Sequence, residues 1–208
     1  MPIAQDISFQ PRKTPIQARS TTTVDAIYEA TIQVLVGDGP ARLTTTRVAE
    51  RAGVSVGTLY QYFPNKRCLL RDLLAQHLGK VTVTVETVCQ TSHDKPLAVM
   101  IQALIEAFVE AKMHRKDASV AFYAISSQLN SEPLSAELRQ RSHAAITTML
   151  RTAPDIRIHE LDFAVTMLVS AMAGTTRAVL EAGASRKKID DLRRHLTLLA
   201  ESYLRATA

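Results

Sequence analysis

The sequence predicts an all-α protein with an N-terminal helix-turn-helix head domain and a larger helical body domain. The chain has 208 residues, 46% of them hydrophobic, which can supply a substantial core. Only seven glycines, eight prolines and no tryptophan are present, which are few turn-forming residues for a many-stranded fold. Apolar residues recur at helical spacing along Ala-, Leu- and Arg-rich stretches. We therefore expect helices throughout.

Positive charge is concentrated near the start of the chain. The formal net charge is +5; residues 1–80 hold ten Lys and Arg against six Asp and Glu, whereas residues 81–208 hold fifteen against fourteen. A local basic excess suits an anionic partner such as nucleic acid, although a solvated basic face gives the same count. Three prolines predict that residues 1–18 form a flexible basic arm, with Arg12 and Lys13 able to reach phosphates.

The cysteines and the apolar segments indicate a cytoplasmic protein without a membrane partner. Cys68 and Cys89 are too few for a disulfide framework, and the first residues lack the apolar core of a secretion signal. The longest uncharged apolar run, residues 163–176, is shorter than the roughly 20 residues that a membrane span needs. We expect this run to be a buried helix.

Three short helices are predicted within residues 19–66, the head domain. The first ends at the Gly37-Asp38-Gly39-Pro40 segment, and the second begins at Thr44 or Thr45 and ends at Gly53. Ser55 can cap the third, which runs to about Phe63, so that only a short turn containing glycine separates the last two helices. This order is the helix-turn-helix arrangement.

Longer helices follow the head domain. Asn65 is predicted to cap a fourth helix over about 65–80, which connects the head to the body domain, residues 81–208. Strong helical periodicity begins at Leu97, Ile158 and Ile189, and weaker patterns cover residues 117–130 and 133–151.

The third helix has the side chains that reading DNA requires. A recognition helix presents small or planar polar groups to base edges while its other face is anchored in its own domain. Leu59 and Phe63 are spaced to face inwards, whereas the tyrosines on either side of Gln61 project outwards. A glycine inside a helix costs roughly 1 kcal/mol relative to Ala, and close approach to DNA would explain Gly57. A helical hairpin without any DNA role fits the bare pattern equally well.

The segment LTTTRVAERAGVSVGTLYQYFPNKRCLL, residues 43–70, resembles the signature of the TetR (tetracycline-repressor-like) family of transcriptional regulators. The resemblance covers about Ala18 to Leu78 and implies a three-helix DNA-binding head with a helical body that binds a ligand and dimerises. By position, it implies phosphate contacts at the start of the second helix, base and backbone contacts on the third and a phosphate-binding lysine at the start of the fourth. The predicted DNA-binding residues are Thr44, Thr45, Thr46, Ser55, Val56, Gly57, Thr58, Tyr60, Gln61, Tyr62 and Lys66, with Thr58 and Gln61 as the expected base readers.

A ligand-responsive repressor that binds a near-palindromic operator in double-stranded DNA is therefore the predicted function. Two recognition helices about 34–36 Å apart require a two-fold dimer, and the last two helices are expected to pair across its axis. A small, mostly hydrophobic effector is expected in the body domain. Its predicted contacts are Gln102, Phe108, Met113, Phe122, Tyr123, His143, Met149 and Met167.

Three other classes of function are compatible with parts of the sequence. An enzyme is not expected, because the chain has no phosphate-binding loop, nucleophile elbow or zinc-protease pair, and neither a cofactor nor a metal is predicted. A redox- or metal-responsive regulator would use Cys68 and Cys89, although buried, inert thiols are the expectation. An architectural DNA-binding protein without a ligand would not need so large and nearly neutral a body domain.

Overall fold

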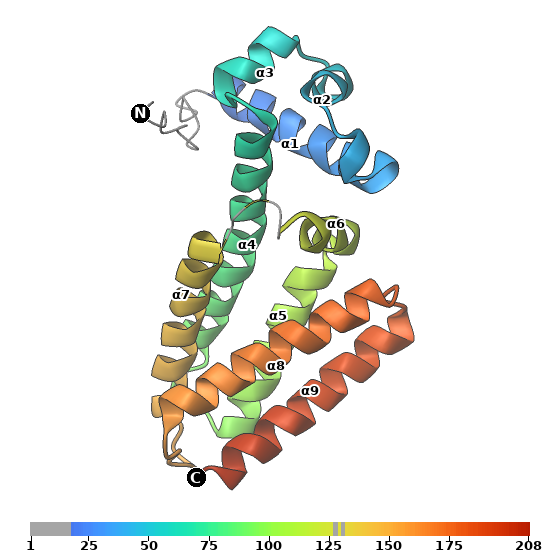
Figure 1. Ribbon diagram of the computed structural model, residues 1–208. Coiled ribbons are helices and arrows are strands. Elements are labelled where there is room, and N and C mark those ends of the chain that lie inside the picture. The colour runs from blue at the N-terminus through green and yellow to red at the C-terminus, as the bar shows by residue number, and fades with distance from the viewer. Residues whose placement is uncertain (1–17, 127–128, 130–131) are drawn as a thin grey trace, which may run out of the picture. The chain divides into compact units, whose positions relative to one another are not determined.

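The computed structural model describes residues 18–126, 129 and 132–208, and their regular elements are helices (Figure 1). The arm predicted over residues 1–18 lies, apart from Ala18, outside the described residues. The helices are α1 (Ala18–Asp38), the 3-10 turn η1 (Pro40–Arg42), α2 (Thr45–Ala52), α3 (Val56–Tyr62), α4 (Lys66–Thr91), α5 (Leu97–Met113), α6 (Lys116–Ser126), α7 (Glu132–Arg151), α8 (Leu161–Glu181) and α9 (Arg186–Ala206).

The chain divides into two compact units. The N-terminal unit comprises residues 1–76 and 121–131, and the C-terminal unit comprises residues 77–120 and 132–208. The division falls inside α4 and α6, so each of these helices contributes to both units. The sequence did not indicate that residues 121–126 belong to the same unit as the N-terminal helices.

Local signals set the helix ends in the N-terminal unit, as predicted. Helix α1 stops at Asp38, and Gly39 follows with a φ of 77°, a backbone conformation that side chains beyond glycine rarely adopt. Helix α2 ends at Gly53 in the left-handed region (φ 68°). The side chain of Asn65 accepts the backbone N–H of Cys68 at 2.8 Å and caps α4.

An aromatic pair joins α1 to the end of α3. The rings of Tyr28 and Phe63 lie 5.6 Å apart at 52°, and both side chains are buried. The hydroxyl of Tyr28 donates to the carboxylate of Asp72 on α4. These contacts tie α1, α3 and α4 together, so Phe63 anchors α3 in its own unit as the sequence predicted.

Helix α4 is longer than the predicted 65–80. It continues to Thr91 because Val81, Val85 and Cys89 extend its buried face at a spacing of four residues. The β-branched threonines of this stretch suit a helix poorly on propensity alone. Tertiary burial outweighs that preference, and the hydroxyls of Thr84, Thr87 and Thr91 donate to carbonyls four residues earlier.

The C-terminal unit is a bundle in which α5 packs on α9 and α8 packs on both α7 and α9 (Figure 1). Its core is built from apolar side chains of α5, α7, α8 and α9 together with the end of α4. Ile101, Leu104 and Val165 are completely buried there. The helical patterns predicted to begin at Leu97 and Ile189 correspond to α5 and α9.

Helix α8 begins later than its apolar pattern indicated. Ile158 lies in the preceding loop, where the backbone N–H of His159 donates to the carbonyl of Thr207 at 2.9 Å. Glu160 then takes a left-handed conformation (φ 50°), and the helix starts at Leu161. This hydrogen bond to Thr207 holds the loop in place, and no pattern in the sequence of the loop predicts it.

The prediction that residues 163–176 form a buried helix is wrong for part of the helix surface. In α8, Phe163 is 62% exposed and Met167 is 46% exposed, whereas Val165 and Leu168 are buried. By length and composition α8 could also cross a membrane, which for one partly buried helix of a helical protein is weak evidence. Part of the apolar face of α8 is therefore exposed.

Candidate nucleic-acid interface

The N-terminus of α2 presents three threonines in different roles. The side chain of Thr44 accepts the backbone N–H of Arg47 at 3.2 Å and caps the helix. The hydroxyl of Thr45 lies 3.0 Å from the hydroxyl of Tyr60 on α3. Thr46 is exposed, and its hydroxyl has no hydrogen bond to any residue that the structure describes. The Thr45–Tyr60 contact joins the two helices of the motif and holds both hydroxyls on one surface.

Helix α3 begins with a compact hydroxyl cap. The side chain of Ser55 accepts the backbone N–H of Thr58 at 2.9 Å, and the two side-chain hydroxyls lie 2.8 Å apart. The expected base reader Thr58 therefore has its hydroxyl already engaged within the protein. Gln61, the other expected base reader, is exposed, and its side chain has no hydrogen-bond partner in the described part of the chain.

Gly57 is exposed near the start of α3, and the fold itself has room for a larger residue there. A methyl group at Gly57 would meet only Oγ of Ser55 at 3.6 Å, an ordinary contact distance. The backbone angle at Gly57 is also one that any residue adopts. Packing within the protein thus does not explain the glycine.

The remaining predicted contacts lie on α3 and at the start of α4. Val56 and Tyr62 are partly exposed on α3, and Tyr60 is 42% exposed. Nζ of Lys66 donates to the carbonyl of Leu43 at 3.2 Å, and this bond links the start of α4 to the segment before α2. An ammonium has three N–H groups, so Lys66 retains two for a phosphate. The surface can therefore offer hydroxyl, amide and ammonium donors to an anion.

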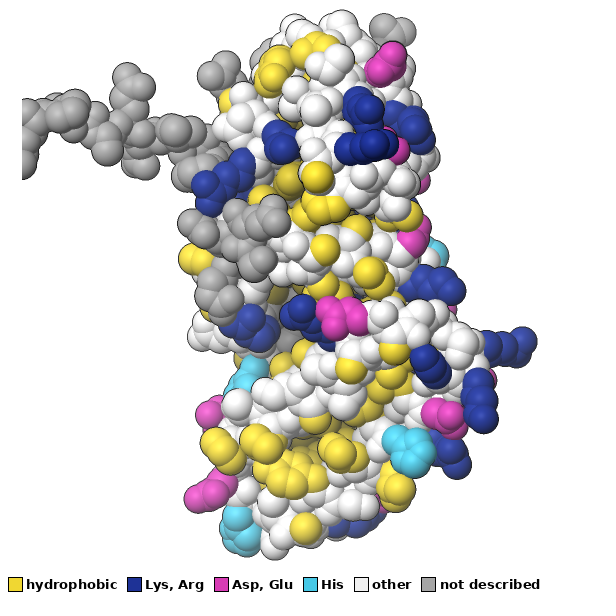
Figure 2. Space-filling view, turned by 45° about the vertical axis from the view of Figure 1, so that its right-hand side comes forward, with side chains coloured by type: hydrophobic (Ala, Val, Ile, Leu, Met, Phe, Trp, Pro, Cys, Tyr) yellow, Lys and Arg dark blue, Asp and Glu magenta, His cyan; other side chains and the backbone are white. Residues whose placement is uncertain are grey.

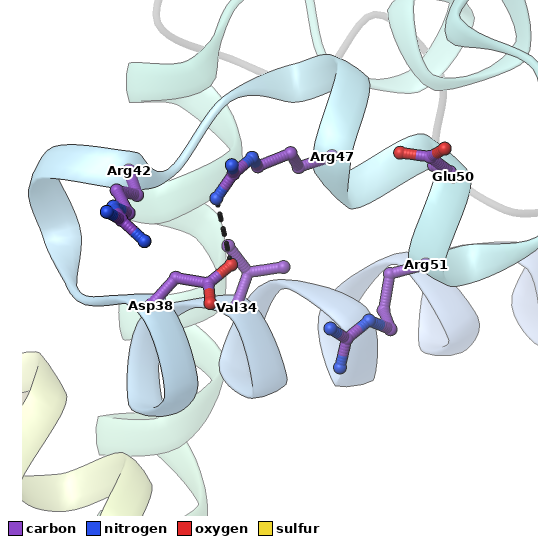
Figure 3. A pocket seen from close by; sticks show the side chains of 6 residues that line it. All are labelled: Val34, Asp38, Arg42, Arg47, Glu50 and Arg51. Atoms are coloured by element: carbon purple, nitrogen blue, oxygen red, sulfur yellow. Dashed lines mark hydrogen bonds and ion pairs between the residues drawn. The ribbon is translucent and has the colours of Figure 1, made fainter.

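A concavity beside this surface was not indicated by the sequence analysis. Its volume is about 540 Å³, and it is lined by Val34 and Asp38 of α1, Arg42 of η1 and Arg47, Glu50 and Arg51 of α2 (Figure 3). The spacing of Arg47 and Arg51, four residues apart on a short helix, is the one sequence signal that could have found it.

The eight predicted ligand contacts are spread over both units. Phe122 and Tyr123 belong to the N-terminal unit and the other six to the C-terminal unit. Met149 is buried in the C-terminal core, and Phe108 and Met113 pack partly buried against that core. Gln102 is exposed and donates to Glu106 at 3.0 Å, and Met167 is exposed on α8. Nε2 of His143 lies 3.0 Å from the carbonyl of Asp162. The ligand site stays a prediction.

A buried polar cluster in the C-terminal unit was also missed. Lys112 is 7% exposed, and burial lowers the pKa of its ammonium to about 8. Nε2 of His77 lies 3.2 Å from the hydroxyl of Ser119, which donates to the carbonyl of Lys112 at 3.0 Å. Burial, and then the charges of Lys112, Lys80 and Arg115, lower the pKa of His77 to about 4. His77 is therefore neutral at pH 7.

Both cysteines are buried free thiols. Burial, and then the charge of Asp72, raise the pKa of Cys68, and burial followed by the charge of Glu86 raises the pKa of Cys89 to about 12. Since the thiolate is the reactive form, neither side chain has the electrostatic setting of a redox sensor.

Two family models match the chain. The model described as "Bacterial regulatory proteins, tetR family" matches residues 27–73, which include α2 and α3. The model described as "Tetracyclin repressor-like, C-terminal domain" matches residues 96–204, more than half of the chain.

Curated relatives are similar over part of their length. The chain is 43% identical over 93 residues to the HTH-type transcriptional regulator YvkB of Bacillus subtilis, which is 44% of this chain and 46% of that protein. It is 42% identical over 55 residues, 26% of either protein, to the transcriptional repressor KstR of Rhodococcus jostii. The matches thus span less than half of the length of these relatives.

Solved structures share the fold over nearly their whole length. A protein of Mesorhizobium loti assigned to the TetR family superposes with a TM-score of 0.75 at 18% identity, covering 91% of this chain and 98% of that one. The fatty acid degradation regulator FadR of Bacillus halodurans gives a TM-score of 0.69 at 15% identity, covering 90% and 96%. At such identities the likeness concerns the fold alone.

Proposed function

Because the chain belongs to the TetR family of bacterial transcriptional regulators, we propose that it binds a near-palindromic DNA operator as a homodimer, represses transcription and leaves the operator when a small molecule binds. It acts in the cytoplasm and is not an enzyme.

The observation that carries the proposal is the surface formed by α2 and α3. Thr45 and Tyr60 are held together at 3.0 Å, so two hydroxyl groups from different helices are positioned before DNA arrives. Such pre-organisation reduces the entropy lost on binding. Gly57 supports close approach of DNA, since the protein itself tolerates a larger residue at that position. Gln61 reads a base edge from the exposed face of α3.

The dimer is proposed to form through α8 and α9. Four large apolar side chains are exposed on these helices, and Figure 2 shows hydrophobic side chains gathered over the same region. Exposed small residues, among them Ser170 and Gly174, continue the α8 face and permit close helix approach. An apolar face of this kind marks an interaction surface. The four side chains are Phe163, Met167, Leu198 and Leu199.

The effector is proposed to be a small hydrophobic or amphipathic molecule. The candidate contacts Phe108, Met113 and Met149 lie in or against the apolar core of the C-terminal unit, where charged molecules bind poorly. A thermal-shift screen tests this class directly. Stabilisation by apolar compounds supports it, and stabilisation by charged metabolites alone would count against it.

The experiment that tests DNA binding is selection of the purified protein on a randomised duplex pool at two salt concentrations. Recovery of a near-palindrome at both concentrations supports a dimeric regulator. Recovery of sequence-independent binding that disappears with salt would favour an architectural protein, because phosphate contacts alone are steeply salt-dependent. A protein that selects no DNA would refute the proposal.

Single substitutions then test the assigned contacts on the selected operator. Tyr62→Ala and Lys66→Ala should each weaken binding about 10- to 100-fold, in line with about 1.5–3 kcal/mol for a hydrogen bond to a charged group, while the thermal unfolding transition is retained. Lys187→Ala, which removes an exposed charge from α9, is the control. Unchanged affinity of both variants in a gel-shift titration would defeat the assignment.

A further inference from the structure

We propose that the concavity lined by Arg42, Arg47 and Arg51 is a phosphate-binding site of the N-terminal unit, separate from the contacts of α3. Its ligand is a phosphoryl group, supplied either by the DNA backbone beyond the reach of the recognition helix or by a free phosphorylated molecule. The inference rests on the proposed function only where DNA is the source.

The charges around the concavity are poorly balanced. Three guanidinium groups line it, and the single recorded ion pair among its residues joins Nη1 of Arg47 to Oδ2 of Asp38 at 3.1 Å. Arg42 and Arg51 are exposed and have no recorded partner in the described part of the chain. The lining also holds the carboxylates of Asp38 and Glu50, so three positive charges face two negative ones and one positive charge is in excess. An anion bound in the concavity balances this excess.

The geometry favours an anion with several oxygens. Figure 3 shows Arg42 and Arg47 directed into the space between the end of α1 and α2, whereas Arg51 extends from α2 toward α1 on the side away from Arg42, where Glu50 also lies. The pair with Asp38 orients Arg47 but uses one of its five N–H donors. Planar guanidinium groups bind phosphate through paired hydrogen bonds. The volume of about 540 Å³ also lies in the range of small-molecule sites.

DNA is the first source to test, since Arg47 and Arg51 lie on α2, whose N-terminal threonines are proposed phosphate contacts. A backbone phosphate bound here would extend the stretch of DNA that each N-terminal unit contacts, without adding base specificity. A free nucleotide or other phosphorylated compound would instead bind without DNA.

The test uses the full chain and the double variant Arg42→Gln/Arg51→Gln, which leaves the Arg47–Asp38 pair intact. The matched control is Arg186→Gln/Lys187→Gln, which removes two exposed charges from α9. Pyrophosphate is titrated at constant ionic strength and followed by calorimetry. Saturable binding is expected for the natural chain and the control, and binding weaker by roughly tenfold or more for the double variant. Equal binding by both variants, or none by the natural chain, overturns the site.

Salt dependence of operator binding then identifies the source. If DNA supplies the phosphate, the slope of log K against log salt becomes shallower by about 0.9 for each contact that the double variant loses. An unchanged slope with lost pyrophosphate binding assigns the site to a free phosphorylated ligand. The pyrophosphate arm needs no operator, so a failure of the proposed regulator function stays distinguishable from a failure of this site.

Discussion

At the scale of single residues, Gly57 is the position where the requirements of folding and of function differ most clearly. The residue lies on the exposed face of α3, yet a methyl group there would meet nothing closer than 3.6 Å. Glycine is unfavourable within helices because it loses more backbone entropy than alanine on folding. Alanine would fit at this position without a steric clash and would favour the helix. The glycine is therefore a candidate for a role in binding.

Gly57→Ala should therefore raise the free energy of unfolding, by up to about 1 kcal/mol, while weakening operator binding. Urea denaturation measures the first effect and a gel-shift titration the second. Gly79→Ala is the matched control, because Gly79 lies within α4 and a methyl group there meets no atom within 4 Å. The control should gain stability and keep its affinity. Undiminished affinity of Gly57→Ala would show that DNA does not approach this position closely.

The hydroxyl of Tyr28 is a second side-chain group with a measurable role. Tyr28 is 6% exposed, and burial together with the hydrogen bond to Asp72 raises the pKa of its phenol. Tyr28→Phe keeps the ring contact with Phe63 but leaves the carboxylate of Asp72 without this donor. The expected loss is about 1–3 kcal/mol in the free energy of unfolding, measured by urea denaturation. Tyr203→Phe is the control and should change the free energy of unfolding little, because the hydroxyl of Tyr203 has no hydrogen bond within residues 18–126, 129 and 132–208. Equal losses in the two variants would contradict the assignment.

Among the helices, α4 depends most on contacts with other parts of the fold. Its first turn is capped locally by Asn65, but its later turns depend on burial of Val81, Val85 and Cys89. His77 lies between these parts and contacts Ser119 on α6. Since Ser119 donates its one proton to the carbonyl of Lys112, Nε2 of His77 is the donor to Ser119, and protonation of the ring adds charge beside Lys112.

The stability of the protein should consequently depend on pH through His77. Its pKa is about 4 in the folded chain and about 6.5 when unfolded. Between these values the unfolded chain binds more protons, so stability falls as the pH drops from 6.5 to 4. His77→Gln should flatten this fall by up to about 1.4 kcal/mol per pH unit. Denaturation at several pH values checks it, with His195→Gln as the exposed control. Parallel profiles for the natural chain and His77→Gln would refute the role of His77.

At the scale of the whole molecule, the apolar face of α8 and α9 is the main apolar surface that is left exposed to solvent. Phe163 and Leu198 are each 62% exposed, more than any other large apolar side chain described. Water-exposed phenyl and leucine groups gain roughly 1.5–3 kcal/mol each when they are buried. A second copy of the same face would bury them symmetrically.

Phe163→Glu combined with Leu198→Glu should convert the proposed dimer into a monomer, measured by sedimentation equilibrium. Operator affinity should fall by at least about tenfold, because the two heads no longer bind as a linked pair. Val83→Glu, which changes a 53% exposed apolar residue on α4, is the control and should remain dimeric. A double variant with the mass of the natural assembly would show that the dimer uses another surface.

The sequence alone was enough for the all-α class, for most helix ends in the N-terminal unit and for the family. Thr44, Gly53, Ser55 and Asn65 act on their own neighbours within a few residues, so their effect can be inferred without the fold. Tertiary packing was needed for the end of α4, the start of α8, the Thr45–Tyr60 bond and the arginine concavity. Each of these depends on burial or on contacts between segments distant in sequence, such as Thr207 with His159 or Ser119 with His77, and local preference does not encode such contacts.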